Sequence, residues 1–327
     1  MTGVQTCALP IYRTAKARVI ESLDAVLGAD AVIATNTSTL PITGLAEYAK
    51  RAKNFIGLHF FSPVDRMPLV EVIRGKRTAD ATLARALDFV QRLRKTPIVV
   101  NDSRGFFTSR FFGSYVNEGI SMIAEGVNPA LIENVARMLG MPVGPLAVQD
   151  EVGLDLAVSV TRQTRADLGE QWQPGTSYPI VEKLSAGLGR HGRKSGGGFY
   201  EYPADGKKHL WTGLAEIWPR SAEQPDPGEV RRRLLYVQLI EALKCMQEGV
   251  LEDPADGDVG AVFGVGFPAY TGGPFSYIDH LGAEQVLREC NALAKRHGPR
   301  FKPPRLLREM ARDGRKFHDA EQSRAAG

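Results

Sequence analysis

"NFIGLHFFSPVDRMPLVEVIRG", residues 54–75, contains two short apolar runs on either side of a turn that carries proline. Residues 54–61 and 69–73 are rich in β-branched and aromatic side chains, which predicts two buried strands. Each run holds one polar exception, His59 in the first and Glu71 in the second. Because a buried imidazole and a buried carboxylate are each costly without a partner, we expect His59 and Glu71 to bond to one another.

The sequence on both sides of this pair alternates between helical and strand patterns. The spacing of apolar residues predicts, in chain order, helix 13–27, strand 31–36, helix 40–51, the two strands above, helix 80–95 and strand 96–100. Strands that alternate with helices of this length indicate a layered α/β sheet. We therefore expect an α/β domain over residues 13–101.

Beyond residue 101 helical patterns dominate, in two blocks that resemble one another. Residues 115–127 parallel 237–250, and residues 140–155 parallel 266–284, with Glu-Gly-Val, Gly-Pro and Asp in the same order. This self-similarity predicts a duplicated all-α domain, with chance likeness of amphipathic helices as the alternative. The expected segments are a tail over 1–12, the α/β domain over 13–101, a helical copy over 102–200, a linker over 201–228 and a second copy over 229–320.

Composition and charge exclude several classes of protein. The chain has 327 residues, 43% hydrophobic and 24% charged, as expected for a globular protein with a sizeable core. No apolar run reaches the ~18 residues of a membrane span. A net charge of +4 with scattered basic residues does not favour nucleic acid. Three cysteines, Cys7, Cys245 and Cys290, lack metal or disulfide spacing, which indicates a reducing compartment such as the cytoplasm.

Polar residues collect where strands are predicted to end. Asn36 and Ser38 stand at the end of strand 31–36, His59 stands near the end of the next strand, and Ser109 begins the helical region. Ligands of open parallel sheets bind beyond the carboxyl ends of strands. We expect these residues to lie in one site.

Three motifs carry a resemblance to a known family. ATNTSTLPI (34–42), the opening stretch and NDSRGFFTSRFF (101–112) together resemble the L-3-hydroxyacyl-CoA dehydrogenases. The duplicated helical half resembles the dehydrogenase part of multifunctional fatty-acid oxidation α-subunits. The resemblance implies a partial Rossmann-like NAD-binding domain, a 3-hydroxyacyl-CoA substrate, and a thiolase subunit or further copies of the chain as partners. It also implies that His59 takes the proton of the substrate 3-hydroxyl while Glu71 holds the imidazole in its tautomer.

The resemblance assigns roles to further residues. Ser38 matches a serine that bonds the substrate oxygen beside the nicotinamide; a helix N-cap is the alternative. Lys16 and Lys194 match lysines near the cofactor, against the alternatives of a solvated helix face and a flexible basic loop.

Two positions depart from the family pattern. The family often has Asn where Ser109 stands, in contact with the substrate carbonyl region. It also often has Asn after His-Phe-Phe, where this chain has Ser62. The resemblance places Asn36 and Ser62 near the cofactor. Serine is shorter, so a water can fill the gap at Ser109. Neither change removes the base.

A dinucleotide-binding sheet begins with a strand, G-x-G-x-x-G and a helix. GLGRHG (187–192) and GVGFPA (264–269) fit the spacing, but neither follows a predicted strand and opens a helix. The fingerprint is expected upstream of Arg13, where MTGVQTCALPIY (1–12) resembles translated adapter sequence joined to a truncated frame; a native tail is the alternative. We therefore expect this chain to bind NAD very weakly and to show no measurable dehydrogenase activity.

Two other functions stay open. One is a 3-hydroxybutyryl-CoA dehydrogenase of a biosynthetic or fermentative pathway, although such short enzymes usually carry one helical domain. The other is a non-catalytic module that docks a thiolase or dimerises through its helices, which the missing glycine-rich loop favours.

Overall fold

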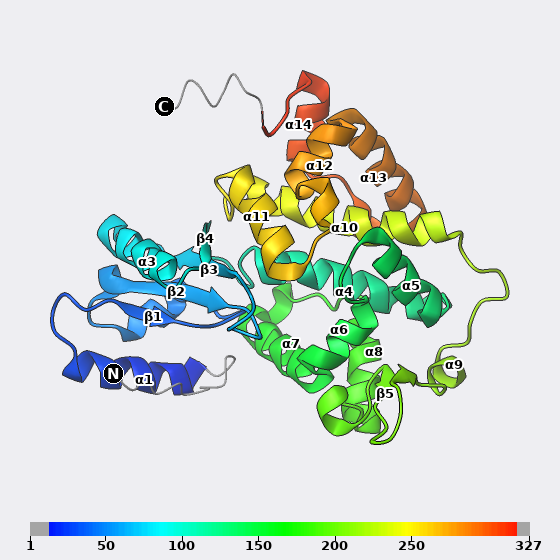
Figure 1. Ribbon diagram of the computed structural model, residues 1–327, viewed down its shortest axis with the longest axis horizontal. Coiled ribbons are helices and arrows are strands. Elements are labelled where there is room, and N and C mark those ends of the chain that lie inside the picture. The colour runs from blue at the N-terminus through cyan, green and yellow to red at the C-terminus, as the bar shows by residue number, and fades with distance from the viewer. Residues whose placement is uncertain (1–12, 319–327) are drawn as a thin grey trace. The chain divides into compact units, whose positions relative to one another are not determined.

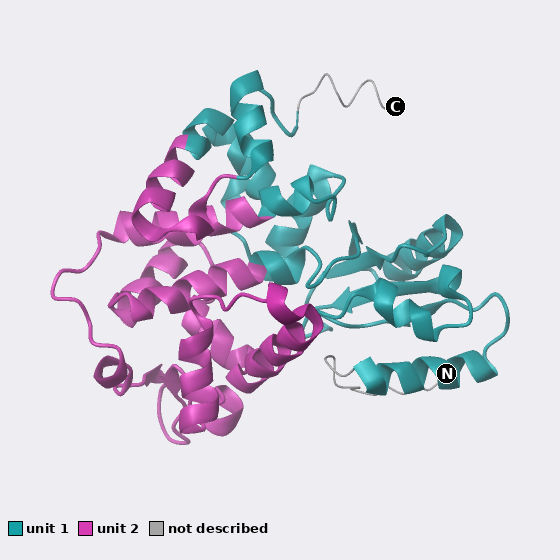
Figure 2. Ribbon diagram, turned by 180° about the vertical axis from the view of Figure 1, so that it is seen from behind, with its two compact units in different colours: residues 1–111, 242–287, 304–327 teal, residues 112–241, 288–303 magenta. Residues whose placement is uncertain are grey.

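The computed structural model describes residues 13–318, which form two compact units (Figure 2). The described parts of the first unit are residues 13–111, 242–287 and 304–318, and those of the second are residues 112–241 and 288–303. The expected tail over 1–12 lies outside the described residues. Within residues 13–318, no helix is both long enough and apolar enough to cross a bilayer.

The first unit is built on a four-stranded sheet with the strand order β1-β2-β3-β4 (Figure 1). The strands are β1 (Ile33–Thr35), β2 (Phe55–Phe60), β3 (Leu69–Arg74) and β4 (Thr96–Asn101). β1 is parallel to β2, β3 is antiparallel to β2, and β4 is parallel to β3. The predicted α/β fold is confirmed, with every expected strand present.

Two helices lie on opposite sides of this sheet (Figure 1). They are α1 (Arg13–Val26) and α3 (Asp80–Arg92). Ala86 and Val90 of α3 share one buried cluster with apolar side chains of the sheet, which are Ile56, Leu58, Val70 and Val72. Full burial of an aliphatic side chain contributes roughly 1.5–3 kcal/mol, so this cluster is a main source of the unit's stability.

A helix from the far end of the chain also packs on the sheet. Helix α11 (Pro254–Val265) contacts β3 and β4. Two glycines allow this helix to approach the sheet closely. A Cβ at Gly260 would lie 2.6 Å from Ile98, and one at Gly264 would lie 2.6 Å from Leu69. The carboxylate of Asp256 accepts the N–H of Val99 at 3.1 Å, 157 residues earlier in the chain. One backbone N–H of β4 is thereby satisfied from outside the sheet, a contact that the sequence pattern does not predict.

Residues 40–51 do not form the single helix that their spacing predicts. Helix α2 spans only Ile42–Leu45 and continues as a 3-10 turn over Ala46–Tyr48. The carboxylate of Asp102 accepts the N–H groups of Ile42 at 2.8 Å and Thr43 at 2.7 Å, which stabilises this first turn. Ala49 then adopts an extended backbone, with φ −92° and ψ 129°, and ends the helical segment.

The remaining elements are mostly helical. They are α4 (Thr108–Ala124), α5 (Pro129–Leu139), α6 (Pro145–Val152), α7 (Leu154–Leu168), α8 (Tyr178–Glu182), β5 (Tyr200–Glu201), β6 (His209–Leu210), α9 (Leu214–Ile217), α10 (Pro227–Gln247), α12 (Pro274–Leu281), α13 (Ala283–His297) and α14 (Arg305–Asp313). In the second unit, Arg233 of α10 pairs with Glu118 of α4 and with Glu125, each at 2.6 Å. The buried pair of Arg233 and Glu118 joins α4 to α10.

The two helical blocks repeat one polar contact in detail. In the first block, the carboxylate of Glu133 on α5 accepts an N–H from the first turn of α6 at 2.8 Å. In the second, the carboxylate of Asp258 on α11 accepts an N–H from the first turn of α12 at 2.7 Å. A Cβ at Gly144, before α6, or at Gly273, before α12, would lie 2.4 Å from the respective carboxylate. Both helix starts thus require glycine for the same reason.

A second contact repeats further along each block. Asp150 on α6 accepts the two consecutive backbone N–H groups of residues 199–200, and Asp279 on α12 accepts those of residues 317–318. We propose, on these paired contacts, that the helical blocks are copies of one ancestral domain, with the boundaries expected from the sequence.

Candidate active site

His59 and Glu71 lie opposite one another on neighbouring strands. The antiparallel register of β2 and β3 pairs the two residues directly, and His59 Nδ1 lies 2.9 Å from Glu71 Oε2. Glu71 is fully buried and His59 is 6% exposed. A carboxylate oxygen only accepts, so we assign the ring proton to Nδ1, which leaves the lone pair of Nε2 to accept on the other side of the ring. The expected bond between the two polar exceptions is present.

Ser38 extends this pair into a line of three polar side chains. Its Oγ lies 3.0 Å from His59 Nε2, in the loop that follows β1. The hydroxyl of Thr37, not that of Ser38, accepts the N–H of Leu40 at 3.2 Å, and no side chain caps α2 from its N-cap position. The N-cap alternative for Ser38 is therefore wrong, and its hydroxyl is directed at the imidazole.

The first turn of α4 holds the carboxylate of Glu71. Oε1 accepts the N–H groups of Phe107 and Thr108, each at 3.0 Å, and Oε2 accepts the Thr108 hydroxyl at 2.6 Å. The positive end of the α4 dipole faces the same carboxylate and adds to the attraction that holds it in place. The sequence analysis does not single out Thr108; its position at a helix start, three residues after Gly105, is the signal that could reveal it.

Lys16 is buried beside the end of β1. It is 7% exposed, and its Nζ donates to the carbonyl of Asn36 at 2.7 Å, so the alternative of a solvated helix face is wrong. Burial lowers the pKa of the Lys16 ammonium from its ordinary value. Asn36 Oδ1 accepts the N–H of Phe60 at 3.3 Å and joins the ends of β1 and β2. Lys16, Asn36, Ser38 and His59 thus gather at one end of these parallel strands.

The other expected site residues have different surroundings. Ser109 is half-buried in the first turn of α4, next to Thr108, and Ser62 is exposed in the loop after β2. Lys194 lies in the second unit, where its ammonium pairs with Asp155 at 2.5 Å.

Neither glycine motif has the setting of a dinucleotide fingerprint. GLGRHG (187–192) starts at the end of a π-helical turn over Lys183–Gly187 and ends at Gly192, whose Cβ would lie 2.4 Å from the carbonyl oxygen of Asp150. GVGFPA (264–269) starts in the last turn of α11, and Gly266 ends that helix with φ 74°. Neither segment connects a strand to a following helix, as the sequence predicted.

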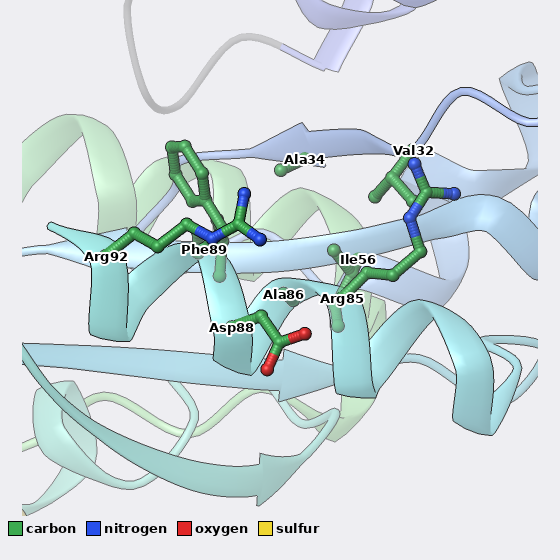
Figure 3. Close-up of a pocket in the computed structure, with 9 residues that line it drawn as sticks. Val32, Ala34, Ile56, Arg85, Ala86, Asp88, Phe89 and Arg92 are labelled. Atoms are coloured by element: carbon green, nitrogen blue, oxygen red, sulfur yellow. The ribbon is translucent and has the colours of Figure 1, made fainter.

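A pocket of about 400 Å³ lies elsewhere in the first unit, between α3 and the sheet (Figure 3). Its lining comprises Val32, Ala34, Ile56 and Leu58 from the β1–β2 side and Arg85, Ala86, Asp88, Phe89 and Arg92 from α3. Among residues 13–318, β1 pairs only with β2, so its other edge has no strand partner. The pocket therefore opens beside an unpaired strand edge, and the polar line at His59 does not contribute to it.

Comparison with known proteins supports the motif-based assignment. Residues 9–103 match the 3-hydroxyacyl-CoA dehydrogenase NAD binding domain, and residues 105–202 match the 3-hydroxyacyl-CoA dehydrogenase C-terminal domain. The fatty acid oxidation complex subunit alpha of Shewanella amazonensis is 38% identical over 306 residues, 93% of this chain and 43% of that protein. The chain thus spans less than half the length of the curated relatives that it matches.

Solved structures agree. The (S)-3-hydroxybutyryl-CoA dehydrogenase from Ralstonia eutropha is 36% identical, with a TM-score of 0.53, over 57% of this chain and 66% of that one. The 3-hydroxybutyryl-CoA dehydrogenase from Escherichia coli K12 has a TM-score of 0.74 over 92% of this chain and 79% of that one; at 24% identity it supports the fold alone. With both domain models matched in order, this chain belongs to the 3-hydroxyacyl-CoA dehydrogenase family and carries its NAD-binding domain.

Proposed function

We propose that the whole protein oxidises (3S)-3-hydroxyacyl-CoA to 3-oxoacyl-CoA with NAD, as a step of fatty-acid β-oxidation. The observation that carries this proposal is the line of Ser38, His59 and Glu71, in which a buried carboxylate orients an imidazole whose other nitrogen faces a hydroxyl. Oxidation of a secondary alcohol removes a proton from oxygen and a hydride from carbon, so the site needs a base beside the alcohol.

His59 is that base in our proposal. Its Nε2 takes the proton of the 3-hydroxyl, and the carboxylate of Glu71 stabilises the imidazolium that results. Ser38 hydrogen-bonds to the same substrate oxygen and fixes its direction toward Nε2. In reduction, the imidazolium returns the proton to the carbonyl oxygen. NAD, when bound, supplies the hydride acceptor.

The polar end of β1 and β2 suits the nicotinamide half of the cofactor, because ligands of such sheets lie at the ends of parallel strands. We propose cofactor contacts at Lys16, Asn36, Ser38, Ser62 and Lys194. We assign neither glycine motif to the pyrophosphate of NAD, because neither motif in residues 13–318 offers a helix N-terminus that follows a strand.

Ser109 is our candidate for the substrate carbonyl, because it follows directly after Thr108 at the helix start. A thiolase subunit and further copies of the chain are the partners that we propose, by analogy with the fatty acid oxidation complex named for the relatives. Cysteine usage favours the cytoplasm as the compartment. The biosynthetic 3-hydroxybutyryl-CoA dehydrogenase and the docking module are the competing proposals.

Turnover of acetoacetyl-CoA with NADH tests the proposal. It is measured in the 327-residue chain and in a chimaera with a relative's strand–glycine–helix segment upstream of Arg13. His59→Gln should lower the rate of the active form by roughly 10²–10⁴, whereas His209→Gln, at an exposed position, should not. An active chimaera that keeps its rate in His59→Gln would refute the base assignment. A folded chimaera that binds NAD but never turns over would favour the docking module.

The same three side chains also have the order of an acyl-transfer triad, serine to histidine to carboxylate. A hydrolase would form an acyl ester on Ser38 and release CoA. A dehydrogenase needs Ser38 only as a hydrogen-bond partner, so Ser38→Ala should weaken but not abolish acetoacetyl-CoA reduction. Thiol release from acyl-CoA that vanishes in Ser38→Ala would support the hydrolase instead.

A further inference from the structure

Thr108 has no role in the proposed reaction so far, yet its side chain touches the site's buried carboxylate. Its hydroxyl donates to Glu71 Oε2 at 2.6 Å, the same oxygen that receives His59 Nδ1 at 2.9 Å. We propose that Thr108 is a positioning residue that sets the direction of the His59 base through Glu71. This inference rests on the proposed function only for its kinetic consequence, because the geometry concerns the chain's own side chains.

The two oxygens of Glu71 are held in different ways. Oε1 is bound by the backbone N–H groups of Phe107 and Thr108, which are present whatever side chains occupy these positions. Oε2 has two side-chain donors, His59 and the Thr108 hydroxyl. The terminal torsion of a glutamate is broad, so one anchored oxygen leaves the carboxylate plane free to tilt. The hydroxyl of Thr108 anchors the second oxygen and fixes that plane.

The fixed plane of the Glu71 carboxylate matters because it sets the orientation of the His59 imidazole. Nδ1–H of His59 follows the position of Oε2, and the Nε2 lone pair points along the opposite side of the ring toward Ser38. A carboxylate that tilts would let the ring rotate or change its tautomer, and the base would then miss the substrate proton. Misplacement on this scale reduces rate without affecting how tightly the substrate binds.

The backbone before Thr108 is shaped to present it. Gly105 has φ 79° and Phe106 has φ 48°, a left-handed conformation that is uncommon for a bulky residue. Phe106 is fully buried, with its ring centroid 6.3 Å from that of His59. Strain of this kind persists where packing over-determines the chain, commonly at functional sites. The result is a rigid helix start, at which the β-branched, fully buried Thr108 has few rotamers to choose from.

Two pairs of variants isolate the hydroxyl. Thr108 and Thr108→Val differ by a hydroxyl for a methyl, and Thr108→Ser and Thr108→Ala differ by a hydroxyl alone. If one variant fails to fold, the other pair still answers the question. Thr82→Val is the matched control, since Thr82 is 3% exposed and its hydroxyl donates to the carbonyl of Lys53 at 2.8 Å.

The first readout is the ¹⁵N spectrum of the His59 imidazole in the 327-residue chain, assigned by its loss in His59→Gln. Couplings from the ring protons identify the protonated nitrogen. With Thr or Ser at position 108 we expect one tautomer, protonated at Nδ1. With Val or Ala we expect the signals to shift toward a mixture of tautomers, and Thr82→Val should match the unmodified chain. Identical imidazole spectra in all folded variants would overturn the proposal.

The second readout is the steady-state rate of acetoacetyl-CoA reduction by NADH. It is measured in the form that shows turnover, the 327-residue chain or the chimaera. Loss of a hydrogen bond to a charged group predicts that kcat falls about 10-fold to 100-fold in Thr108→Val and Thr108→Ala, with KM unchanged. Thr108→Ser should restore kcat. A fall in kcat that serine does not rescue would overturn the positioning role. If the unmodified protein shows no dehydrogenase turnover, the proposed function fails, while the spectra still decide whether Thr108 aims His59.

Discussion

Glu71→Gln is the change that most directly tests how the site is built. Glu71 accepts four hydrogen bonds, from the backbone N–H groups of Phe107 and Thr108 on Oε1, and from Thr108 Oγ1 and His59 Nδ1 on Oε2. The backbone donors cannot change, so the glutamine oxygen should take the place of Oε1. The amide NH₂ must then occupy the place of Oε2 and donate toward His59.

An NH₂ group that faces Nδ1 reverses the imidazole. Nδ1 must become the acceptor, the proton moves to Nε2, and Nε2–H then points at Ser38 Oγ, 3.0 Å away. The lone pair that would take the substrate proton is lost. The corresponding Asp-to-Asn change in serine proteases lowers kcat by about 10⁴ through the wrong tautomer. We therefore expect a loss of roughly 10³–10⁴ in kcat, which is about 4–5.5 kcal/mol in activation free energy.

The same change should leave the protein folded. Replacing charge-assisted bonds at one carboxylate costs about 1–3 kcal/mol, which is less than the 5–15 kcal/mol typical of a domain. Glu133→Gln is the matched control, because Glu133 is 1% exposed and its carboxylate also accepts a backbone N–H, at 2.8 Å. Acetoacetyl-CoA reduction measures kcat and the His59 ¹⁵N spectrum reports the tautomer. A Glu71→Gln enzyme that keeps kcat within about tenfold and retains Nδ1–H would refute this reasoning.

Three further predictions concern stability and cofactor binding. Burial raises the pKa of Asp150 from 3.8 to about 6, so the native state binds its proton more tightly than the unfolded state does; the free energy of unfolding should therefore fall as pH rises through this window, by up to about 3 kcal/mol. Denaturant titrations at several pH values should show this slope reduced in Asp150→Asn, and parallel profiles would contradict it. Gly144→Ala should cost about 1–3 kcal/mol, because its Cβ would lie 2.4 Å from the Glu133 carboxylate. Gly28→Ala, with nothing within 4 Å of its Cβ, should change stability by less than about 1 kcal/mol, and equal effects of the two would show that the close approach is not costly. Calorimetry should detect at most very weak NAD binding by the 327-residue chain, and micromolar affinity would show that no further glycine-rich segment is needed.

Much of the first unit could be predicted from local sequence. Short apolar runs that are rich in β-branched and aromatic residues and bounded by turn residues predict strands at 54–61 and 69–73, and the structure has β2 and β3 there. His59 and Glu71 stood out as polar exceptions inside those runs. Residues 40–51 show the limit of the method. Their apolar residues have the spacing of a helix, but the segment forms only a short one. Its first turn is stabilised by Asp102, about sixty residues away in sequence.

Only the tertiary structure decided how the site is held. The antiparallel register of β2 and β3 places His59 directly opposite Glu71; had the register slipped by one residue, the two side chains would lie on opposite faces of the sheet. The hydroxyl of Thr108 reaches Glu71 across 37 positions of sequence, and Asp256 reaches β4 across 157. Apolar periodicity determines which residues are buried and in what element, because that depends on near neighbours along the chain. Which buried donor meets which acceptor depends on turns and packing far away, and local pattern carries no information about those distances.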